Sequence, residues 1–262
     1  MTTAEPVNTE MNLPTVLAEI AGPSGAGKST LSSTINMIDP RVRAGLTIWR
    51  LPKSSLAASC VSSATDLFRL GLERRRFRKE ELKQVIRLDA FYRLLNHHVS
   101  DDRDRYSALM LDEGVVFAIA KLRADINADH RTPKMRYGEE KVLDRWSSIL
   151  DAIVWLDAPD GVLIDRVRTR AKQHRMKNKP DATVREFLKR YREAYESVIS
   201  DLVSLGGIRV LRFATEQIES LAMANEIRRM CDEIRGTKKW VNTSPEVEVK
   251  SGHAVQPTIA GQ

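Results

Sequence analysis

The sequence predicts one three-layer α/β domain in which helices cover both faces of a five-stranded parallel sheet. Two observations support this fold class. Short apolar segments, the expected strands, alternate along the chain with longer amphipathic segments, the expected helices. A glycine-rich segment with a phosphate-binding pattern stands between the first strand and the first helix. We expect the domain to span residues 14–236, between a flexible arm of residues 1–13 and a flexible polar tail of residues 237–262.

Five short segments have the composition expected of strands. They cover residues 16–20, 45–50, 107–111, 152–156 and 208–213. The segments at 107–111 and 152–156 are almost continuously apolar, which is typical of parallel strands buried on both faces. Each is followed directly by an acidic residue, Asp112 and Asp157 respectively.

The helices are predicted from apolar residues that recur at helical spacing. After the glycine-rich segment, Leu31, Ile35 and Ile38 mark a helix that Pro40 ends. The region 131–150 is less regular, and we expect Pro133 and Gly138 to break it before a charged helix. The other expected helices cover residues 66–78, 80–98, 115–125, 163–171, 183–205 and 218–235.

Composition excludes several classes of protein. Of the 262 residues, 42% are hydrophobic and 29% charged, an ordinary balance for a soluble domain. No apolar run approaches the roughly 20 residues of a membrane span, and the polar, acidic N-terminus carries no secretory signal. Cys60 and Cys231 are isolated, and the five histidines lack metal-ligand spacing. We therefore expect a cytoplasmic protein without disulfides, zinc or a membrane partner.

The net charge of +7 is concentrated in two regions, residues 74–79 and 166–179. Nucleic-acid-binding proteins usually carry one continuous basic surface, whereas two separate basic clusters favour the binding of small phosphorylated molecules. We therefore do not expect a nucleic-acid partner. A solvated basic surface is the alternative.

The glycine-rich segment fits the pattern G-x-x-x-x-G-K-[ST]. Its glycines allow backbone conformations closed to other residues, so that the N–H groups of the loop and of the following helix can point at one anion. Lys28 is expected to reach the β and γ phosphates, and the Ser29 hydroxyl to bind Mg²⁺. The sequence thus predicts ATP and Mg²⁺ as ligands. The residues expected to bind the nucleotide are Gly22, Pro23, Ser24, Gly25, Ala26, Gly27, Lys28, Ser29 and Thr30.

Two acids at the end of the strand 107–111 are candidate catalytic residues. Asp112 stands where ligand-facing acids commonly lie in such sheets, and it can hold Mg²⁺ together with Ser29. Glu113 could position or deprotonate an acceptor hydroxyl. The alternatives are a strand-end cap for Asp112 and a surface acid for Glu113, because successive strand residues point to opposite faces.

Basic residues supply the remaining candidates. Arg166 and Arg170 lie at i, i+4 spacing on the helix that follows residues 152–156, and they suit a lid that closes over phosphates. Their alternative is a solvated helix face, and the role of Arg175 is left open. Arg50 and Lys53, after the second strand, could contact an acceptor or be ordinary surface cations.

The order of these elements resembles the thymidylate-kinase-like branch of small P-loop kinases. The matching segments are residues 22–30, 86–93, 155–159 and 187–202, together with Asp112 and the pair Arg166 and Arg170. The resemblance covers roughly residues 14–235 and implies the P-loop NTPase fold with strands in the order 2-3-1-4-5. It implies that Arg166 packs on the adenine and that its basic neighbours, Arg170 among them, form the lid. Arg93 in the matching helix becomes a candidate substrate-binding residue.

The sequence also departs from that family. An arginine that holds the acceptor's phosphate usually follows the strand-end aspartate, and Glu113 stands there instead. We therefore expect a small-molecule kinase whose acceptor is a nucleotide, a nucleoside or another hydroxyl-bearing metabolite. A nucleotide switch or ATPase without an acceptor, and a kinase or ATPase acting on nucleic acid, remain alternatives. A transporter ATPase is rejected, because no Leu-Ser-Gly-Gly-Gln type signature occurs. The oligomeric state, a homodimer included, stays open.

Overall fold

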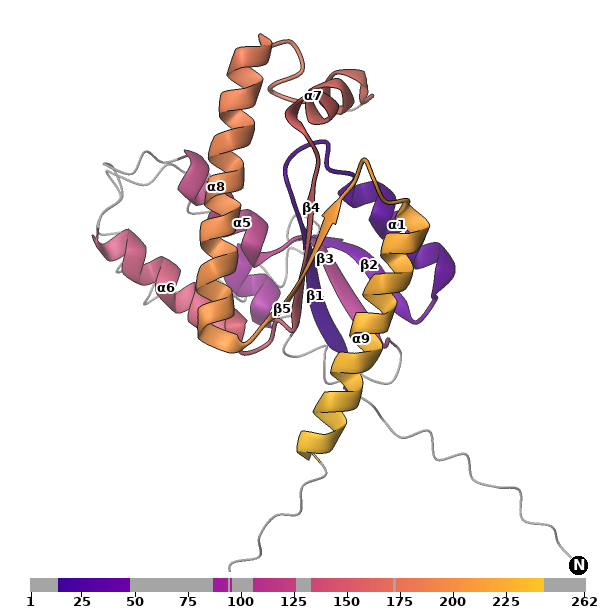
Figure 1. The fold of residues 1–262 in the computed structure, drawn as a ribbon. Helices are drawn as coiled ribbons and strands as arrows, with labels where there is room; N and C mark the ends of the chain where they lie inside the picture. Colours follow the sequence, from indigo (N-terminus) through magenta and orange to yellow (C-terminus); the bar gives the residue numbers. More distant parts are fainter. Residues whose placement is uncertain are drawn as a thin grey trace, which may run out of the picture.

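A computed structural model describes residues 14–47, 87–93, 95, 106–125, 133–171 and 173–242. Its centre is a five-stranded, entirely parallel sheet in the order β2-β3-β1-β4-β5 (Figure 1). The strands are β1 (Val16–Ala21), β2 (Val42–Thr47), β3 (Ala108–Glu113), β4 (Ala152–Asp157) and β5 (Arg209–Ala214). The predicted fold class and strand order are confirmed.

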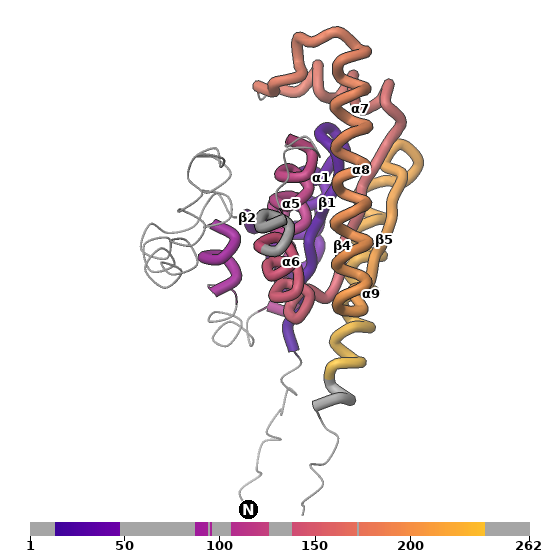
Figure 2. The backbone as a smooth tube through the Cα atoms, turned by 90° about the vertical axis from the view of Figure 1, so that its left-hand side faces the viewer, coloured from indigo at the N-terminus to yellow at the C-terminus, as the bar shows by residue number. Residues whose placement is uncertain are grey.

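Helices cover both faces of this sheet. On one face lie α1 (Lys28–Ile38) and α9 (Ser220–Asn242), which contact each other. On the other face lie α5 (Val115–Asp125), α6 (Pro133–Ser147) and α8 (Asp181–Gly206), while α7 (Asp160–Thr169) extends past the end of β4 (Figures 1 and 2). Residues 87–93 are also helical, within the predicted helix 80–98. The predicted helix 66–78 lies outside the described residues.

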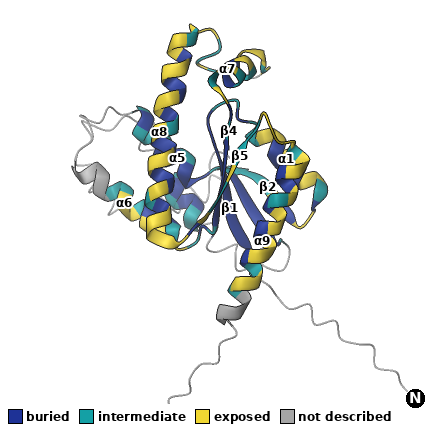
Figure 3. Cartoon of the chain, in the orientation of Figure 1, coloured by how far each residue is buried: buried dark blue, intermediate teal, exposed yellow. Residues whose placement is uncertain are grey.

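The core is continuous through the three layers. Every residue of the central strand β1 is buried, and the inward faces of α5, α8 and α9 pack against the sheet (Figure 3). Because all five strands are parallel, their carboxyl ends meet at one edge. The glycine-rich segment after β1, the two acids that end β3 and helix α7 after β4 all lie at that edge, so the fold brings these distant segments together.

The second strand begins earlier than predicted. We expected residues 45–50, whereas β2 starts at Val42, and residues 48–50 lie outside the described part of the chain. The side-chain amide of Asn36 in α1 bonds both the N–H of Ala44 (2.8 Å) and its carbonyl (3.1 Å), which fixes the start of the strand. Gly45 has φ 86° at a register shift between β2 and β3, so it forms an irregularity within the strand rather than its beginning.

Two predicted helix boundaries are wrong. Pro133 opens α6 instead of breaking it, since a first-turn position needs no N–H donor, and Gly138 lies inside the helix. The last helix continues past Arg235 to Asn242, where a hydrogen bond of 2.7 Å between Lys238 Nζ and Asp151 ties this extension to the sheet.

None of the helices in the described ranges is both long and apolar enough to cross a membrane.

Candidate nucleotide-binding and transfer site

The loop after β1 requires glycine at two close approaches. Gly22 has φ 151°, and a Cβ there would lie 2.3 Å from the carbonyl oxygen of Leu156 at the end of β4. Gly25 has φ 89°, and its Cβ would lie 3.0 Å from the carbonyl oxygen of Leu163 in α7. The loop is therefore packed directly against β4 and α7, and α1 begins immediately after it at Lys28. With this loop between β1 and α1, the chain has the P-loop NTPase fold that the motif predicts.

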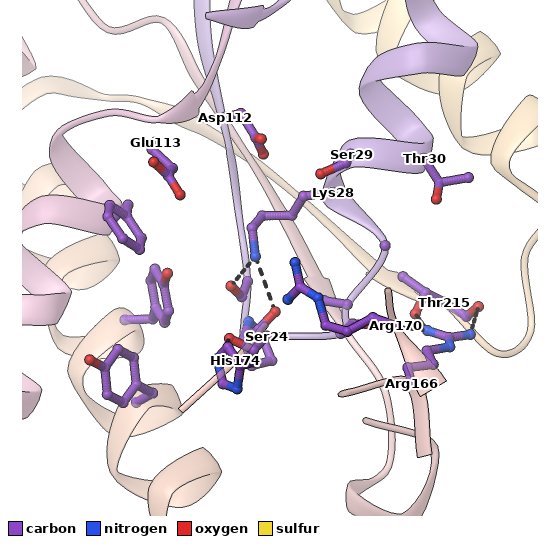
Figure 4. Close-up of a pocket in the computed structure, with 18 of the residues that line it drawn as sticks. Ser24, Lys28, Ser29, Thr30, Asp112, Glu113, Arg166, Arg170, His174 and Thr215 are labelled. Atoms are coloured by element: carbon purple, nitrogen blue, oxygen red, sulfur yellow. Dashed lines mark hydrogen bonds between the residues drawn. The ribbon is translucent and has the colours of Figure 1, made fainter. Parts of the chain in front are cut away.

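Lys28 is half-buried, and its amine lies against the beginning of the loop. Its Nζ donates hydrogen bonds to the carbonyl oxygens of Gly22 (2.7 Å) and Pro23 (3.1 Å). Burial lowers the pKa of the Lys28 ammonium, and the nearby carboxylates of Asp112 and Glu113 partly offset this effect. The amine thus lies at the start of the loop, within reach of the acidic end of β3 (Figure 4).

The acids predicted as catalytic lie at the same edge. β3 includes both Asp112 and Glu113, so it begins one residue later and ends two residues later than the predicted strand 107–111. Glu113 accepts a hydrogen bond of 3.2 Å from the hydroxyl of Thr47, its register partner at the end of β2. Both acids line the cavity that contains Lys28 and Ser29. The fold therefore brings together all the residues predicted to serve the metal and the transferred group.

These residues fit a magnesium ion. A Ser29 hydroxyl and an Asp112 carboxylate are oxygen donors, which Mg²⁺ prefers, and both face one cavity (Figure 4). Two protein oxygens would be sufficient, because Mg²⁺ usually takes one or two protein ligands and completes its shell with water and phosphate.

Arg166 joins α7 to the loop and to the end of β5. Its guanidinium donates to the carbonyl of Gly25 (3.3 Å), the hydroxyl of Thr215 (2.8 Å) and the carbonyl of Thr215 (3.2 Å). Arg170 was predicted on the same helix, but α7 ends at Thr169 and Arg170 has extended backbone angles. Both guanidinium groups nevertheless line the cavity, with Arg170 on the side of Lys28 (Figure 4).

Arg175 lies in the segment between α7 and α8, where it contacts two helices, α5 and α8. Its guanidinium donates to the hydroxyl of Tyr191 (2.6 Å) and to Asp125 (3.1 Å), and it lies 4.7 Å from the ring centre of Phe187. Tyr191 donates to Asp125 as well (3.0 Å). These contacts hold the segment between α7 and α8 against α8 and the end of α5.

One cavity of about 860 Å³ connects all these groups. At one end the phosphate loop, Arg166 and Thr215 face apolar side chains of the β5–α9 connection and α9, Ile218 and Met223. Another part of the wall, next to His174, is aromatic. It is formed by Phe117, Phe187, Tyr191 and Tyr195.

Several cavity residues were not predicted as site residues. Phe187 and Tyr191 were expected only as inward residues of the long helix; their spacing on one helix face as aromatic residues is the sequence feature that could have indicated a ligand wall. Nothing in the sequence indicates Thr215 or His174. His174 contacts Ser24 of the loop, with 3.1 Å between Nε2 and Oγ.

Glu19 was also missed, although a glutamate inside an apolar strand is unusual. It is fully buried in β1, and its carboxylate accepts the N–H groups of Gly114 (3.0 Å), Val116 (2.9 Å) and Phe117 (2.9 Å) at the start of α5. A Cβ on Gly114 would lie 2.5 Å from Glu19 Oε2. Glu19 thereby fixes the segment that directly follows Asp112 and Glu113.

The predicted substrate residues are not gathered in the described site. Arg50 and Lys53, and the basic cluster 74–79, lie outside the described residues. Arg93 is described, and its guanidinium pairs with Asp89 on its own helix (2.9 Å). It is not among the residues that line the cavity. The contribution of these three residues to an acceptor site stays a prediction.

Comparison of the sequence with family models and with curated proteins gives no match. Comparison with solved structures gives matches of low sequence identity. A deoxyadenosine kinase from M. mycoides with dCMP and dCDP is 14% identical, with a TM-score of 0.49, and the match covers 83% of this chain and 100% of that one. The same kinase with dATP gives 13% identity and a TM-score of 0.46. The YorR protein of Bacillus subtilis, in complex with phosphorylated GDP, is 16% identical with a TM-score of 0.43, over 83% of this chain and 96% of that one.

Proposed function

We propose that this protein is an ATP-dependent small-molecule kinase. It transfers the γ-phosphoryl group of ATP to a nucleotide, a nucleoside or another hydroxyl-bearing metabolite. One observation carries the proposal: a single cavity of about 860 Å³ joins a phosphate loop to a pair of strand-end acids and an aromatic wall. Such a volume lies at the upper end of the usual range for small-molecule sites, which suits a nucleotide together with a second substrate.

The loop end of the cavity suits the nucleotide. The N–H groups of the loop and the first turn of α1 supply partial positive charge for the phosphates, and Lys28 adds a full charge at the β and γ positions. Arg166 and the apolar side chains of Ile218 and Met223 would contact the base. This assignment follows the resemblance to thymidylate-kinase-like enzymes, of which we propose the chain is a divergent relative.

The metal would be held by Ser29 and Asp112. When bound, Mg²⁺ neutralises charge on the phosphates and orients them for in-line transfer. The protein's own contribution there is to fix two oxygen donors at the ends of the loop and of β3. Arg170 lies on the side of Lys28 and would stabilise charge on the transferred group.

The acid end of the cavity suits the acceptor. As the acceptor oxygen bonds to the γ-phosphorus and the bond from phosphorus to the leaving ADP oxygen breaks, Glu113 takes the acceptor's hydroxyl proton. The Thr47 hydroxyl, 3.2 Å from Glu113, orients that carboxylate. The aromatic wall offers a planar apolar surface for the rest of the acceptor. Because Glu113 stands where the family has an arginine, we propose that the group nearest the transfer point is an uncharged hydroxyl.

The first experiment is ADP release from Mg·ATP with nucleoside monophosphates, nucleosides and sugars as acceptors. We expect a rate that rises with an unphosphorylated acceptor, is abolished in Lys28→Ala and falls in Glu113→Gln. In Glu113→Arg the rate with an anionic acceptor should rise relative to that with a neutral one. Full activity of folded Lys28→Ala would contradict the mechanism. Tight ATP binding without any acceptor-dependent rate would instead favour a nucleotide switch.

A further inference from the structure

His174 lies in the segment between α7 and α8 and contacts the phosphate loop, 150 residues away in sequence. Its Nε2 is 3.1 Å from the hydroxyl oxygen of Ser24. The ring packs edge-on against Phe187 at a centroid distance of 6.1 Å, which fixes the plane of the imidazole. His174 thus belongs to the same cavity as Lys28 and Arg170, although no sequence motif includes it.

The hydrogen bonds of His174 define its tautomer. The N–H of Met176 donates to Nδ1 at 3.2 Å, so Nδ1 carries no proton. In the neutral ring the proton is then on Nε2, which donates it to Ser24. Burial, reinforced by the positive charges of Arg170, Arg175 and Lys28, lowers the pKa of His174 below its usual 6.5. At neutral pH the ring therefore presents an uncharged Nε2–H donor to the cavity.

This donor points at the part of the loop that receives the terminal phosphate. Lys28, which serves the β and γ phosphates in loops of this kind, bonds the carbonyl oxygens of Gly22 and Pro23. Ser24 is the next residue, so the Nε2–H of His174 lies at the β/γ end of the loop rather than at the base end (Figure 4). The groups around it are cationic or neutral donors, an environment that favours an anion.

We propose that His174 is a phosphate-binding residue whose Nε2–H turns from Ser24 to an oxygen of the terminal phosphoryl group of bound ATP. The proposal rests on the proposed function, because it requires a triphosphate in the loop. In the ligand-free protein the bond to Ser24 keeps the donor in place. In the complex the same donor distinguishes a triphosphate from a diphosphate, because ADP offers no γ oxygen there. His174 also makes the segment between α7 and α8 part of the γ-phosphate site.

Three substitutions of His174 distinguish the hydrogen-bonding role of Nε2 from that of Nδ1. The amide nitrogen of glutamine can replace Nε2 as a donor, whereas asparagine can replace only the Nδ1 side, and alanine replaces neither. Affinities for Mg·ATP and Mg·ADP are measured by calorimetry for each variant. We expect His174→Asn and His174→Ala to lose about tenfold in ATP affinity, the usual effect of one hydrogen bond to a charged group, and about twofold or less in ADP affinity. His174→Gln should stay within about threefold of the wild type for both.

Nitrogen NMR of the imidazole gives a readout independent of any variant's folding. The ligand-free wild type should show the Nε2–H tautomer, and the Nε2 resonance should shift with Mg·ATP more than with Mg·ADP. An Nδ1–H tautomer, or equal shifts with both nucleotides, would overturn the proposal. So would equal ATP and ADP losses in the folded variants. Wild type that binds no ATP would overturn the proposed function itself, whereas ATP binding that is indifferent to His174 would overturn only this inference.

Discussion

Replacing Glu19 by glutamine tests how the fold accommodates a buried carboxyl group. The side chain is 0% exposed and accepts three backbone N–H groups at the start of α5. Burial nevertheless outweighs these bonds and raises the pKa of Glu19 from 4.5 to about 7, and the charge of Asp112 contributes in the same direction. The folded protein therefore keeps a proton on Glu19 at pH values where the unfolded chain has lost it.

The sign and size of the pH effect follow from this difference. Between pH 4.5 and 7 the folded state binds one more proton than the unfolded chain, so raising the pH through this range destabilises the fold. The slope is about 1.4 kcal/mol per pH unit, which gives about 3 kcal/mol between pH 5 and 8, and the change ends above the folded-state pKa. Glutamine does not titrate, and it keeps the two N–H bonds to one oxygen while losing the third.

The assay is urea denaturation of wild type and Glu19→Gln at pH 5 and pH 8, without nucleotide or Mg²⁺. The other titrating groups are the same in both proteins, so they cancel in the difference between the two free energies of unfolding. We expect the wild-type value, relative to that of the variant, to fall by about 3 kcal/mol from pH 5 to pH 8. A change below about 1 kcal/mol, or one in the opposite direction, would refute the conclusion that Glu19 is protonated in the fold near neutral pH.

Three further predictions concern the loop, a helix and the core. Lys28→Ala should weaken ATP binding at least about tenfold in calorimetry, because the charged donor to the phosphates is lost, while the half-buried position of Lys28 leaves thermal stability nearly unchanged. Gly25→Ala, with φ 89° and its new Cβ 3.0 Å from the Leu163 carbonyl, should lower the free energy of unfolding by about 1–3 kcal/mol. The control is Gly138→Ala in α6, where a Cβ meets nothing within 4 Å, and it should raise the free energy of unfolding by up to about 1 kcal/mol. Equal effects of the two substitutions would contradict the close approach of Gly25 to Leu163. Burial raises the pKa of Cys231 to about 12, so iodoacetamide at pH 8 should label its peptide only in denaturant, and rapid labelling of the native protein would be the contrary result.

The phosphate loop and its setting could be predicted because their determinants are local. The glycines, Lys28 and Ser29 are adjacent in sequence, and the flanking strand and helix are marked by their own periodicity. The strand-end position of Asp112 and Glu113 follows from the apolar run before them. Boundaries that depend on partners elsewhere were predicted less well: the start of β2 depends on Asn36 in α1, and the end of α9 on Asp151 before β4.

The sequence by itself determined the layers, the glycine-rich loop after β1 and the acids at the end of β3, because each depends on residues that are close together in the sequence. Only the tertiary structure decided what surrounds them. His174, Thr215 and Glu19 acquire their roles from hydrogen bonds to partners between about 50 and 150 positions away, and no local pattern encodes such pairs. Parallel strands bring their carboxyl ends to a common edge, and the segments that meet there are selected by packing over the whole chain rather than by their own propensities.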